Sequence, residues 1–515
     1  MAKQDDFIQK VNEGYAFKGA SILMGKANYA GNVMANVEVR IPLKTINRHG
    51  LIAGATGTGK TKTLQLFSEQ LSANSVPVVL MDIKGDLSGI AAAGTVNDRI
   101  TTRCQQLNYD FKPTANPVEL LTLSQQKGTR LRATVSEFGP VLLTKILGLN
   151  DTQGGVVALI FKYCDDNKMP LLDLKDFIKV LQFIGNEGKD ELEKLYGKIS
   201  TTSTGTILRK VIELQQQGAD MFFGETSFDI NDLMRISDDG RGIISVLRVT
   251  DLQDKPKLFS TFMLQMLAEL YANCPEEGDL DQPKLVLIID EAHLIFQEAS
   301  NALLEQIETI IKLIRSKGVG IFFCTQNPMD VPSSILAQLG LKVQHALRAF
   351  TAADRKVIKQ TAENYPETDF YQIDELITQL GIGEAFITCL NEKGVPTPLV
   401  HSVMCPPASR MDILTNAEID ALVANSKIAK KYNAEVDSES AYEILNAKLA
   451  VAQEAAAKIE AEEAEAKEEK HEKKEKGFFD NPAVKQASRT AASVIVRGLL
   501  GAIGFGGRGK KSSWF

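Results

Sequence analysis

The sequence has few cysteines, and none of them forms a C-x-x-C pair. The six cysteines of the 515-residue chain are scattered along its length. A structural zinc site or a disulfide framework needs characteristic cysteine spacings, so the sequence predicts neither. Scattered free thiols fit a reducing compartment, and the expected location is cytoplasmic.

Long apolar runs are also absent. No stretch approaches the roughly 18 apolar residues that a membrane-spanning helix needs. The first residues, MAKQDDF, lack the apolar core of a secretory signal. The sequence therefore predicts neither a signal peptide nor a transmembrane segment.

The chain has no excess of positive charge. Its formal net charge is −7, which does not indicate nucleic-acid binding for the chain as a whole. The charge is unevenly distributed, so such binding is not excluded either. A hydrophobic content of 44% with 24% charged residues is ordinary for a soluble globular protein, and the length allows two or three domains.

What the sequence does contain is a phosphate-binding loop. Residues 54–61 read GATGTGKT, which fits the pattern G-x-x-x-x-G-K-[ST]. Glycines allow positive φ angles, so successive N–H groups can turn toward one phosphate. Lys60 is predicted to bind the β- and γ-phosphates of ATP, and Thr61 to ligate Mg²⁺. The expected nucleotide-binding residues are Gly54, Ala55, Thr56, Gly57, Thr58, Gly59, Lys60, Thr61 and Lys62.

The flanks of this loop match a strand–loop–helix unit. Residues 49–53 form a short, mostly apolar run, and residues 60–71 carry apolar side chains at helical spacing. The N-terminus of such a helix points at the bound anion. With both flanks in place, a nucleotide site explains the motif better than a chance match.

A second motif, at residues 285–291, predicts ATP hydrolysis. Five apolar residues, LVLII, are followed by Asp290 and Glu291. A buried strand of this kind delivers Asp290 toward Mg²⁺ and Glu291 toward the attacking water. An adjacent acidic pair at a strand's end has no use in a core, so the two motifs together predict an Mg²⁺-dependent ATPase. His293 has no partner histidine and is not predicted to be a metal ligand.

Two further residues extend the predicted site. The expected strand at 319–325 is followed by Gln326, which either contacts the γ-phosphate or merely ends the strand. Arg315 ends the helix before that strand. It either stabilises charge on the γ-phosphate of a neighbouring subunit, or it is a cation that serves its own helix C-terminus. Arg348 is a second arginine candidate.

The apolar run at residues 76–82 ends in the sequence DIKGD. As a second buried strand, it would carry Asp82 and Asp86 to the edge where α/β sheets bind ligands. Either carboxylate could approach Mg²⁺ or the phosphates. The alternative, that they cap the helix that follows, is equally open.

Strands alternating with helices predict an α/β fold with a mostly parallel sheet. Further strands are expected at residues 242–249, 343–350 and 384–390. The expected parts are a small β-rich N-terminal segment at 1–48, a P-loop ATPase core at 49–96 and 241–406, a helical insertion at 97–240, a helical extension at 407–450, a charged linker or helix at 451–476 and a basic amphipathic tail at 477–515.

The tail combines basic residues with an apolar helical face. The tail contains six lysines and arginines and a single acidic residue, Asp480. Such a segment could bind an acidic surface, whether DNA, a partner or a membrane. Docking on its own protein is an equally open alternative.

These stretches resemble the HerA–FtsK class of P-loop ATPases with an additional strand. The closer resemblance is to the bacterial HerA-like helicase family, formerly described as a domain of unknown function. It is carried by NRHGLIAGATGTGKTKTLQ at 47–65, MDIKGDLSGI at 81–90, RATVSEFGPVLL at 132–143, LVLIIDEAHLIF at 285–296, LIRSKGVGIFFCTQNPMDVP at 313–332, QLGLKVQHALRAFT at 338–351 and VRGLLGAIG at 496–504.

The resemblance implies a ring, typically a hexamer, that moves duplex DNA through a central pore. It implies that Gln326 is the sensor glutamine. It also implies that Arg315, 24 residues after Glu291 and 11 before Gln326, acts as a finger in the neighbouring site. A protein partner such as a nuclease is compatible with it. The long helical insertion departs from the better understood motors of the class.

Two functions follow as hypotheses. The first is an oligomeric ATPase that translocates or remodels duplex DNA. The second is an ATP-dependent assembly or switch protein that acts on a protein partner without nucleic acid, which the acidic balance favours modestly. DNA stimulation of ATP hydrolysis, sensitive to salt, separates the two.

Overall fold

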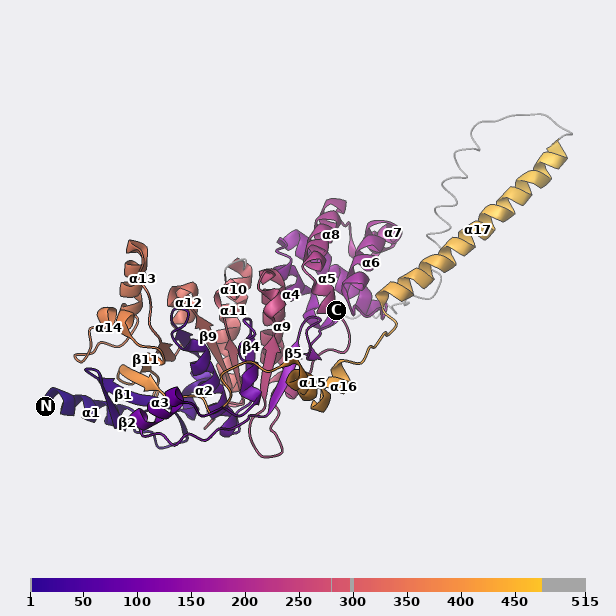
Figure 1. Cartoon of the computed structure of the whole chain (residues 1–515). Helices are drawn as coiled ribbons and strands as arrows, with labels where there is room; N and C mark the ends of the chain where they lie inside the picture. The colour runs from indigo at the N-terminus through magenta and orange to yellow at the C-terminus, as the bar shows by residue number, and fades with distance from the viewer. Residues whose placement is uncertain (1, 279, 297–300, 475–515) are drawn as a thin grey trace. The chain divides into compact units, whose positions relative to one another are not determined.

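The structure is a computed structural model that describes residues 2–278, 280–296 and 301–474. It divides into two compact units, which are described separately (Figure 1). Unit 1 comprises Met1–Arg132 and Thr226–Ala434, and unit 2 comprises Ala133–Glu225 and Glu435–Phe515.

A twelve-stranded sheet forms the centre of unit 1, in the order β2-β1-β12-β11-β10-β3-β9-β8-β4-β7-β5-β6. Its strands are β1 Ser21–Tyr29, β2 Asn32–Pro42, β3 Gly50–Ala53, β4 Val78–Asp82, β5 Val118–Thr122, β6 Thr129–Arg130, β7 Ile244–Arg248, β8 Leu285–Ile289, β9 Val319–Thr325, β10 Leu341–Gln344, β11 Glu384–Thr388 and β12 Val400–Met404. The strands from β10 to β6 are parallel, whereas β2, β1, β12 and β11 pair antiparallel. The predicted α/β fold with a mostly parallel sheet is confirmed.

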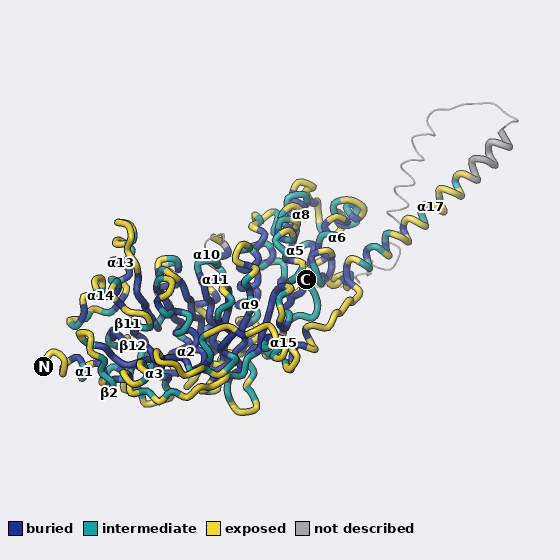
Figure 2. The backbone as a smooth tube through the Cα atoms, in the orientation of Figure 1, coloured by how far each residue is buried: buried dark blue, intermediate teal, exposed yellow. Residues whose placement is uncertain are grey.

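The middle strands are buried along their whole length. Every residue of β8 and β9 is buried, and both strands are apolar except for Thr325 at the end of β9. Figure 2 shows this interior in dark blue. A strand covered on both faces needs such a run rather than alternation. On the face next to the P-loop, Phe67 of α2 packs on Phe322 of β9, with ring centroids 4.8 Å apart.

Helices and 3-10 turns connect these strands. The helices of unit 1 are α1 Ala2–Gly14, α2 Lys60–Ala73, α3 Asp98–Leu107, α9 Pro256–Asn273, α10 His293–Phe296, α11 Asn301–Ile314, α12 Ser333–Leu336, α13 Ala352–Glu363, α14 Ile373–Gln379, α15 Asn416–Asn425 and α16 Ala429–Tyr432. The 3-10 turns are η1 Leu43–Arg48, η2 Ser88–Ala91, η4 Ile230–Leu233, η5 Thr250–Leu252, η6 Arg315–Lys317 and η7 Pro328–Asp330.

The N-terminal segment belongs to the same sheet. The hairpin of β1 and β2 continues it, because β1 pairs with β12. Helix α1, which the sequence did not predict, packs its Phe7 on Tyr29 of β1 with ring centroids 4.9 Å apart. The expected small β-rich segment is therefore one end of the core sheet.

Unit 2 is helical. It contains α4 Val135–Ile146, α5 Asp151–Asp166, α6 Leu174–Gly185, α7 Lys189–Tyr196, α8 Thr201–Gln216, the turn η3 Ala219–Met221 and α17 Ala441–Lys474. Asp176 of α6 ties α17 to the unit, since its Oδ1 accepts from Ser440 Oγ at 2.5 Å and from the N–H of Tyr442 at 3.0 Å. Such acceptance at the first turn of a helix is typical of N-terminal capping.

Two expected boundaries differ from the structure. The stretch expected as helical from residue 97 contains β5 and β6 of the sheet. Glu119 interrupts the apolar pattern of β5, yet it is buried and paired with Arg235 at 3.0 Å. The strand expected at 343–350 ends at Gln344, because its neighbour β3 ends at Ala53, directly opposite.

Residues 405–433, here called the strap, follow the last strand. The helical extension expected at 407–450 is helical in α15, α16 and the first residues of α17, whereas residues 407–415 and 433–440 are not helical. The strap is fastened to α2 by Glu69, which accepts the N–H groups of Ala408 at 2.6 Å and Ser409 at 3.1 Å. Burial raises the pKa of Glu69 to about 7.

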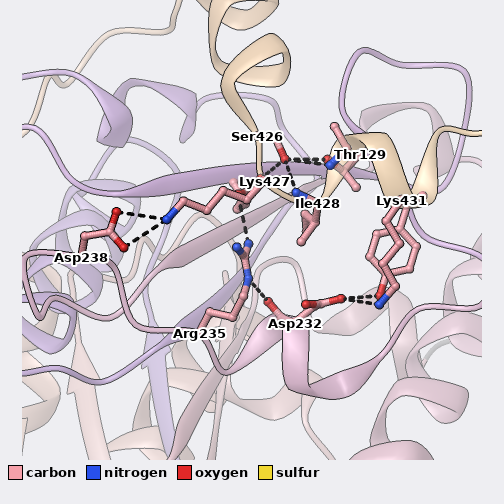
Figure 3. A network of polar contacts seen from close by, with 11 residues as sticks. Thr129, Asp232, Arg235, Asp238, Ser426, Lys427, Ile428 and Lys431 are labelled. Atoms are coloured by element: carbon pink, nitrogen blue, oxygen red, sulfur yellow. Dashed lines mark hydrogen bonds and ion pairs between the residues drawn. The ribbon is translucent and has the colours of Figure 1, made fainter.

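The end of the strap is held by ionic contacts (Figure 3). Lys427 reaches Asp238 at 3.0 Å, and Lys431 reaches Asp232 at 2.9 Å. Ser426 donates to Glu119 of β5 at 2.6 Å. The strap therefore links the P-loop helix to the strands at the far edge of the sheet.

The remaining C-terminal residues continue as α17. The charged stretch that was expected as a linker or a helix is helical as far as Lys474. The predicted basic tail, 477–515, lies outside the described residues. Among the residues described, no helix combines the length and apolarity that crossing a membrane requires.

Candidate nucleotide site

The P-loop and the acidic pair lie at one edge of the sheet. β3, β9, β8 and β4 are successive parallel neighbours. Parallel strands end at the same edge, so the segments that follow them converge there. The structure thereby brings the P-loop together with Asp290, Glu291 and Gln326, and it adds the turn after β4.

Glycines shape the loop between β3 and α2. Gly54, Gly57 and Gly59 have φ angles of 151°, 78° and 111°, which residues with side chains rarely adopt. A Cβ at Gly54 would lie 2.5 Å from the Cβ of His345, so this position also needs glycine for space. A Cβ at Gly57 would meet no described atom within 4 Å, so the loop is open at that point.

Lys60 begins α2 and folds back over the loop. Its Nζ donates to the carbonyls of Gly54 at 2.5 Å and Ala55 at 3.1 Å. Burial lowers the pKa of Lys60. Thr58 donates to the Ala55 carbonyl at 2.7 Å, and Thr61 lies half-buried in the first turn of α2. The ammonium is thus bound by the loop's own oxygens, which are weaker acceptors than phosphate.

The acidic pair is buried at the end of β8. Asp290 and Glu291 are 3% and 4% exposed. Burial, followed by the neighbouring Glu291 carboxylate, raises the pKa of Asp290. Glu291 has a φ of 45°, a left-handed conformation that costs about 1–2 kcal/mol for a residue with a side chain. Backbone strain of this kind clusters at functional sites.

Gln326 connects the P-loop to the acidic pair. Its Oε1 accepts from Thr56 Oγ1 at 3.2 Å, and its Nε2 donates to Oε1 of Glu291 at 3.4 Å. The side chain therefore touches both motifs instead of only ending a strand. Its role as a sensor stays a prediction.

Sequence reasoning missed Lys84, which lies in the turn after β4. Its Nζ forms an ion pair with Oε1 of Glu291. Burial lowers the pKa of Lys84, but the hydrogen bond and the charge of Glu291 outweigh it, so the pKa lies above its ordinary value. The signal was present in the sequence: Lys84 lies two residues after the end of β4, the strand that neighbours the acidic strand.

The second oxygen of Glu291 is less well satisfied. Nδ1 of His293 lies 3.2 Å from Oε2 but not in hydrogen-bonding geometry. Oε2 is buried and has no hydrogen-bond partner among the described residues. Buried polar atoms are usually paired, so an unpaired carboxylate oxygen is typical of a site that accepts a proton or a water.

The two other acids after β4 differ from each other. Asp82 accepts the backbone N–H groups of Gly85 at 2.7 Å, Asp86 at 3.1 Å and Leu87 at 3.2 Å. Asp82 therefore holds the turn between β4 and η2, and it is not the N-cap of the helix that follows, a position that Leu87 takes. Burial raises the pKa of Asp82 to about 6. Oδ1 of Asp86 is buried, with no hydrogen-bond partner among the described residues.

The other side of the P-loop is held by His345, directly after β10. Its Nδ1 donates to the Glu384 carbonyl at 2.9 Å, so its Nε2 accepts from the Thr63 hydroxyl at 3.0 Å. Burial lowers the pKa of His345 to about 4, so the ring is neutral near pH 7. This histidine fixes the first turn of α2 without adding charge.

A cavity of about 330 Å³ opens on this same side. Residues of α2, α3 and the chain ends beside β11 and β12 line it, among them Thr63, Arg99, Arg103, Ile382 and Met404. The guanidinium of Arg103 is fixed by the carbonyls of Ile382 at 3.0 Å and Gly383 at 3.1 Å. Lys62, predicted to bind nucleotide, also lines it, but its Nζ donates to the Met411 carbonyl of the strap.

The structure does not bring Arg315 to the P-loop of its own chain. Arg315 follows α11 and precedes β9, whereas Gln326 follows that strand. It lies near the buried His49, whose pKa is lowered to about 4 by burial and, to a smaller degree, by Arg315. Arg348, the second candidate, follows β10 at the P-loop edge and donates to the Thr378 carbonyl at 2.9 Å.

Magnesium would fit the acidic pair only together with a nucleotide. Within the described residues no cluster of three or more His, Cys, Asp or Glu side chains could hold a metal ion. Mg²⁺ commonly takes one or two protein oxygens and completes its shell with phosphate and water. Thr61 and the buried Asp290 supply protein oxygens of that kind at the phosphate-binding edge.

The model of the helicase HerA-like C-terminal family matches residues 28–510, nearly the whole chain. The chain belongs to this family. The predicted resemblance is thereby confirmed, and the P-loop and acidic pair of this HerA-like chain lie within the matched region.

Relatives of the HerA-like chain are found among archaeal proteins. A DNA double-strand break repair helicase HerA of Sulfolobus acidocaldarius is 22% identical over 385 residues, which cover 72% of this chain and 67% of the relative. The protein of the same name in Sulfurisphaera tokodaii is 24% identical over 381 residues, with the same two shares. Among solved structures, plasmid coupling protein TrwB with a non-hydrolysable ATP analogue is 14% identical, with a TM-score of 0.49, over 77% of this chain and 99% of that one.

Proposed function

We propose that this HerA-like chain is an ATP-hydrolysing motor that acts on duplex DNA and depends on Mg²⁺. The observation that carries the proposal is the joining of Thr56, Gln326 and Glu291 by side-chain contacts at one edge of the sheet. A loop that only stores nucleotide has no need of a buried glutamate linked to it. Family membership and the names of the two archaeal relatives support the assignment to DNA.

The proposed chemistry divides among few residues. Lys60 exchanges its loop carbonyls for β- and γ-phosphate oxygens, since charged acceptors form stronger bonds. Thr61 and Asp290 hold Mg²⁺, which supplies charge neutralisation at the phosphates. Glu291 accepts a proton from the attacking water while the bond between the γ-phosphorus and the ADP oxygen breaks. Gln326 orients that water or the γ-phosphate.

The cavity beside α2 is the proposed place for the base and ribose. Glu291 and Gln326 lie on the β9–β8 side of the P-loop, so the γ-phosphate is expected there. The other end of the nucleotide then extends toward β10 and β11, where the cavity opens. Ile382 and Met404 offer apolar surface for a base, and Arg99 offers a cation.

Arg315 is proposed to act on the neighbouring subunit in a ring. Between it and Gln326 lies β9, whose seven residues span roughly 20 Å when extended. An arginine placed so far from its own P-loop cannot neutralise the γ-phosphate there. Supplied by the neighbour, an arginine finger raises turnover about 10³–10⁵-fold. Six subunits and a nuclease partner stay predictions.

The deciding experiment measures ATP hydrolysis with and without duplex DNA on a sample of known oligomeric mass. We expect stimulation by duplex DNA that falls steeply as salt rises, because phosphate contacts release counterions. Hydrolysis that no DNA stimulates at low salt would contradict the DNA motor. It would favour the second hypothesis, an ATP-driven switch on a protein partner, for which the helical unit 2 offers a separate module.

A further inference from the structure

Lys84 occupies a position that its backbone makes rigid. Asp82, the last residue of β4, binds the three N–H groups of the turn that follows it. Gly85 closes that turn with a φ of 78°. A side chain there would also approach Thr250, whose Cγ2 lies 2.9 Å from the Cβ position. The turn therefore places Lys84 beside the end of β8.

The lysine side chain itself remains partly accessible. Lys84 is 36% exposed, whereas its partner Glu291 is only 5% exposed at the side chain. A partly exposed lysine is thus bound to a buried carboxylate. A flexible four-carbon stem allows the ammonium to move while the backbone stays fixed.

Two ammonium groups belong to the edge of the sheet where the terminal phosphate is expected, that of Lys60 on the P-loop and that of Lys84 on Glu291. Lys60 and Lys84 are close enough for the charge of one to lower the pKa of the other, behind the larger effect of burial on Lys60. Each is bound to an internal acceptor, Lys60 to loop carbonyls and Lys84 to Glu291. A γ-phosphate between them would offer both a more highly charged acceptor.

The ion pair opposes the expected role of Glu291. A carboxylate that accepts a proton from water needs an oxygen that can contact that water, and the ammonium of Lys84 occupies Oε1. Oε1 of Glu291 receives both Lys84 and Gln326. A group that removes Lys84 from Oε1 would therefore make that oxygen more accessible to a water.

We infer that Lys84 is a second phosphate-binding lysine that senses the γ-phosphate. It is bound to Glu291 when that phosphate is absent, and it transfers to the phosphate when ATP binds. The transfer frees Glu291 to take a proton from the attacking water. ADP has no γ-phosphate, so Lys84 stays on Glu291 after hydrolysis and phosphate release. The inference rests on the proposed ATPase function.

The first test compares binding of a non-hydrolysable ATP analogue and of ADP by competition with a fluorescent nucleotide. Lys84→Ala should weaken the analogue about 10- to 100-fold, the range of a hydrogen bond to a charged group. ADP affinity should change less than about twofold, because ADP does not engage Lys84. Lys84→Arg should retain most of the preference for the analogue. Lys112→Ala, which removes an exposed lysine paired with the exposed Asp110, is the matched control.

A double-mutant cycle tests the transfer itself. Glu291→Gln removes the internal partner of Lys84, so the analogue should bind severalfold tighter than to the parent chain. In the double variant with Lys84→Ala that gain should vanish, which measures the coupling of the two residues. Thermal unfolding of each variant establishes that it is folded.

Turnover supplies an independent readout. Lys84→Ala should lower kcat at saturating ATP about tenfold or more, and Lys84→Arg should restore part of it. Equal losses of analogue and ADP affinity, or faster turnover in Lys84→Ala, would overturn the inference. A parent chain that binds the analogue but does not hydrolyse ATP would overturn the proposed function alone, because the ratio of the two affinities still tests Lys84.

Discussion

The two sides of the P-loop are built in opposite ways. On the β10 side, His345 is neutral, fully buried and paired at both ring nitrogens, with Thr63 and Glu384. On the β8 side, Glu291 is buried, strained in its backbone and without a hydrogen bond to Oε2 among the described residues. The first arrangement can only hold the helix in place. The second keeps a reactive group whose partners can change.

From this difference we expect the reaction on the β8 side and structural support of α2 on the β10 side. A neutral, satisfied network gains nothing from a bound phosphate, so it remains the same through a catalytic cycle. A carboxylate bound to a mobile ammonium responds to any competing anion. Substitutions on the β8 side should therefore change turnover, and substitutions on the β10 side should change stability.

The largest effect is expected from Glu291→Gln. The amide cannot accept a proton from water, and general-base catalysis typically contributes about 10²–10⁴-fold to a rate. Nucleotide binding should remain, because the amide is nearly the same size as the carboxylate. Steady-state ATP hydrolysis and analogue binding, measured on one preparation, check both points. Hydrolysis at the parent rate would remove Glu291 from the role of base.

Lys60→Ala should lower both ATP hydrolysis and nucleotide affinity, since Lys60 lies between the two sides of the P-loop. Removing one cation from a preorganised phosphate site typically lowers turnover about 10²–10³-fold. Calorimetric titration with ADP should also show weakened binding, because Lys60 engages the β-phosphate. Retained ADP affinity would mean that the loop carbonyls of Gly54 and Ala55 are the permanent partners of this ammonium.

The sequence predicted the β8 side well and the β10 side poorly. The P-loop, Asp290, Glu291 and Gln326 follow apolar strands, so their positions are set by local pattern and parallel pairing. His345 lies inside a run that reads as a continuing strand, and only the end of β3 shows that the chain leaves the sheet there. Lys84 was missed because its partner lies more than 200 residues away in sequence. The strand β5 was missed because it contains the charged Glu119. The ion pair with Arg235 that allows Glu119 to be buried is a tertiary contact, which the local sequence does not show.

A smaller effect is expected from Gln326→Ala. The change removes the contacts of Gln326 with Thr56 and Glu291, which are long at 3.2 Å and 3.4 Å in this state. Loss of one orienting hydrogen bond corresponds to about a tenfold fall in kcat. Analogue affinity should change little, and Thr56→Val offers a comparison that removes only the contact on the loop. Stopped-flow measurement of a single turnover separates the chemical step from product release.

The smallest effect on turnover is expected from His345→Asn, which acts on stability. Asparagine keeps an N–H near the position of Nδ1 but cannot accept from Thr63. The pKa of His345 is about 4 when folded and about 6.5 when unfolded, so the neutral ring stabilises the fold above pH 6.5. That contribution, up to about 3 kcal/mol, is lost as the pH falls from 6.5 toward 4.

Urea unfolding of the parent chain and of His345→Asn, measured from about pH 7.5 to 4.5, checks this pH dependence through the difference between their stabilities. The parent chain should lose more stability than His345→Asn as the pH falls, so the two curves converge. Taking the difference removes the opposite contribution of Glu69, whose raised pKa of about 7 favours the fold at lower pH. His49→Gln is a matched control: His49 is equally buried, with a pKa of about 4, but it contacts Ile311 and Ile321 and not α2. His49→Gln should show the same difference from the parent chain in the pH dependence of stability as His345→Asn does, without any change in nucleotide affinity.

If His345→Asn instead lowered kcat as far as Gln326→Ala does, the β10 side would take part in the reaction and the two sides would not be opposites.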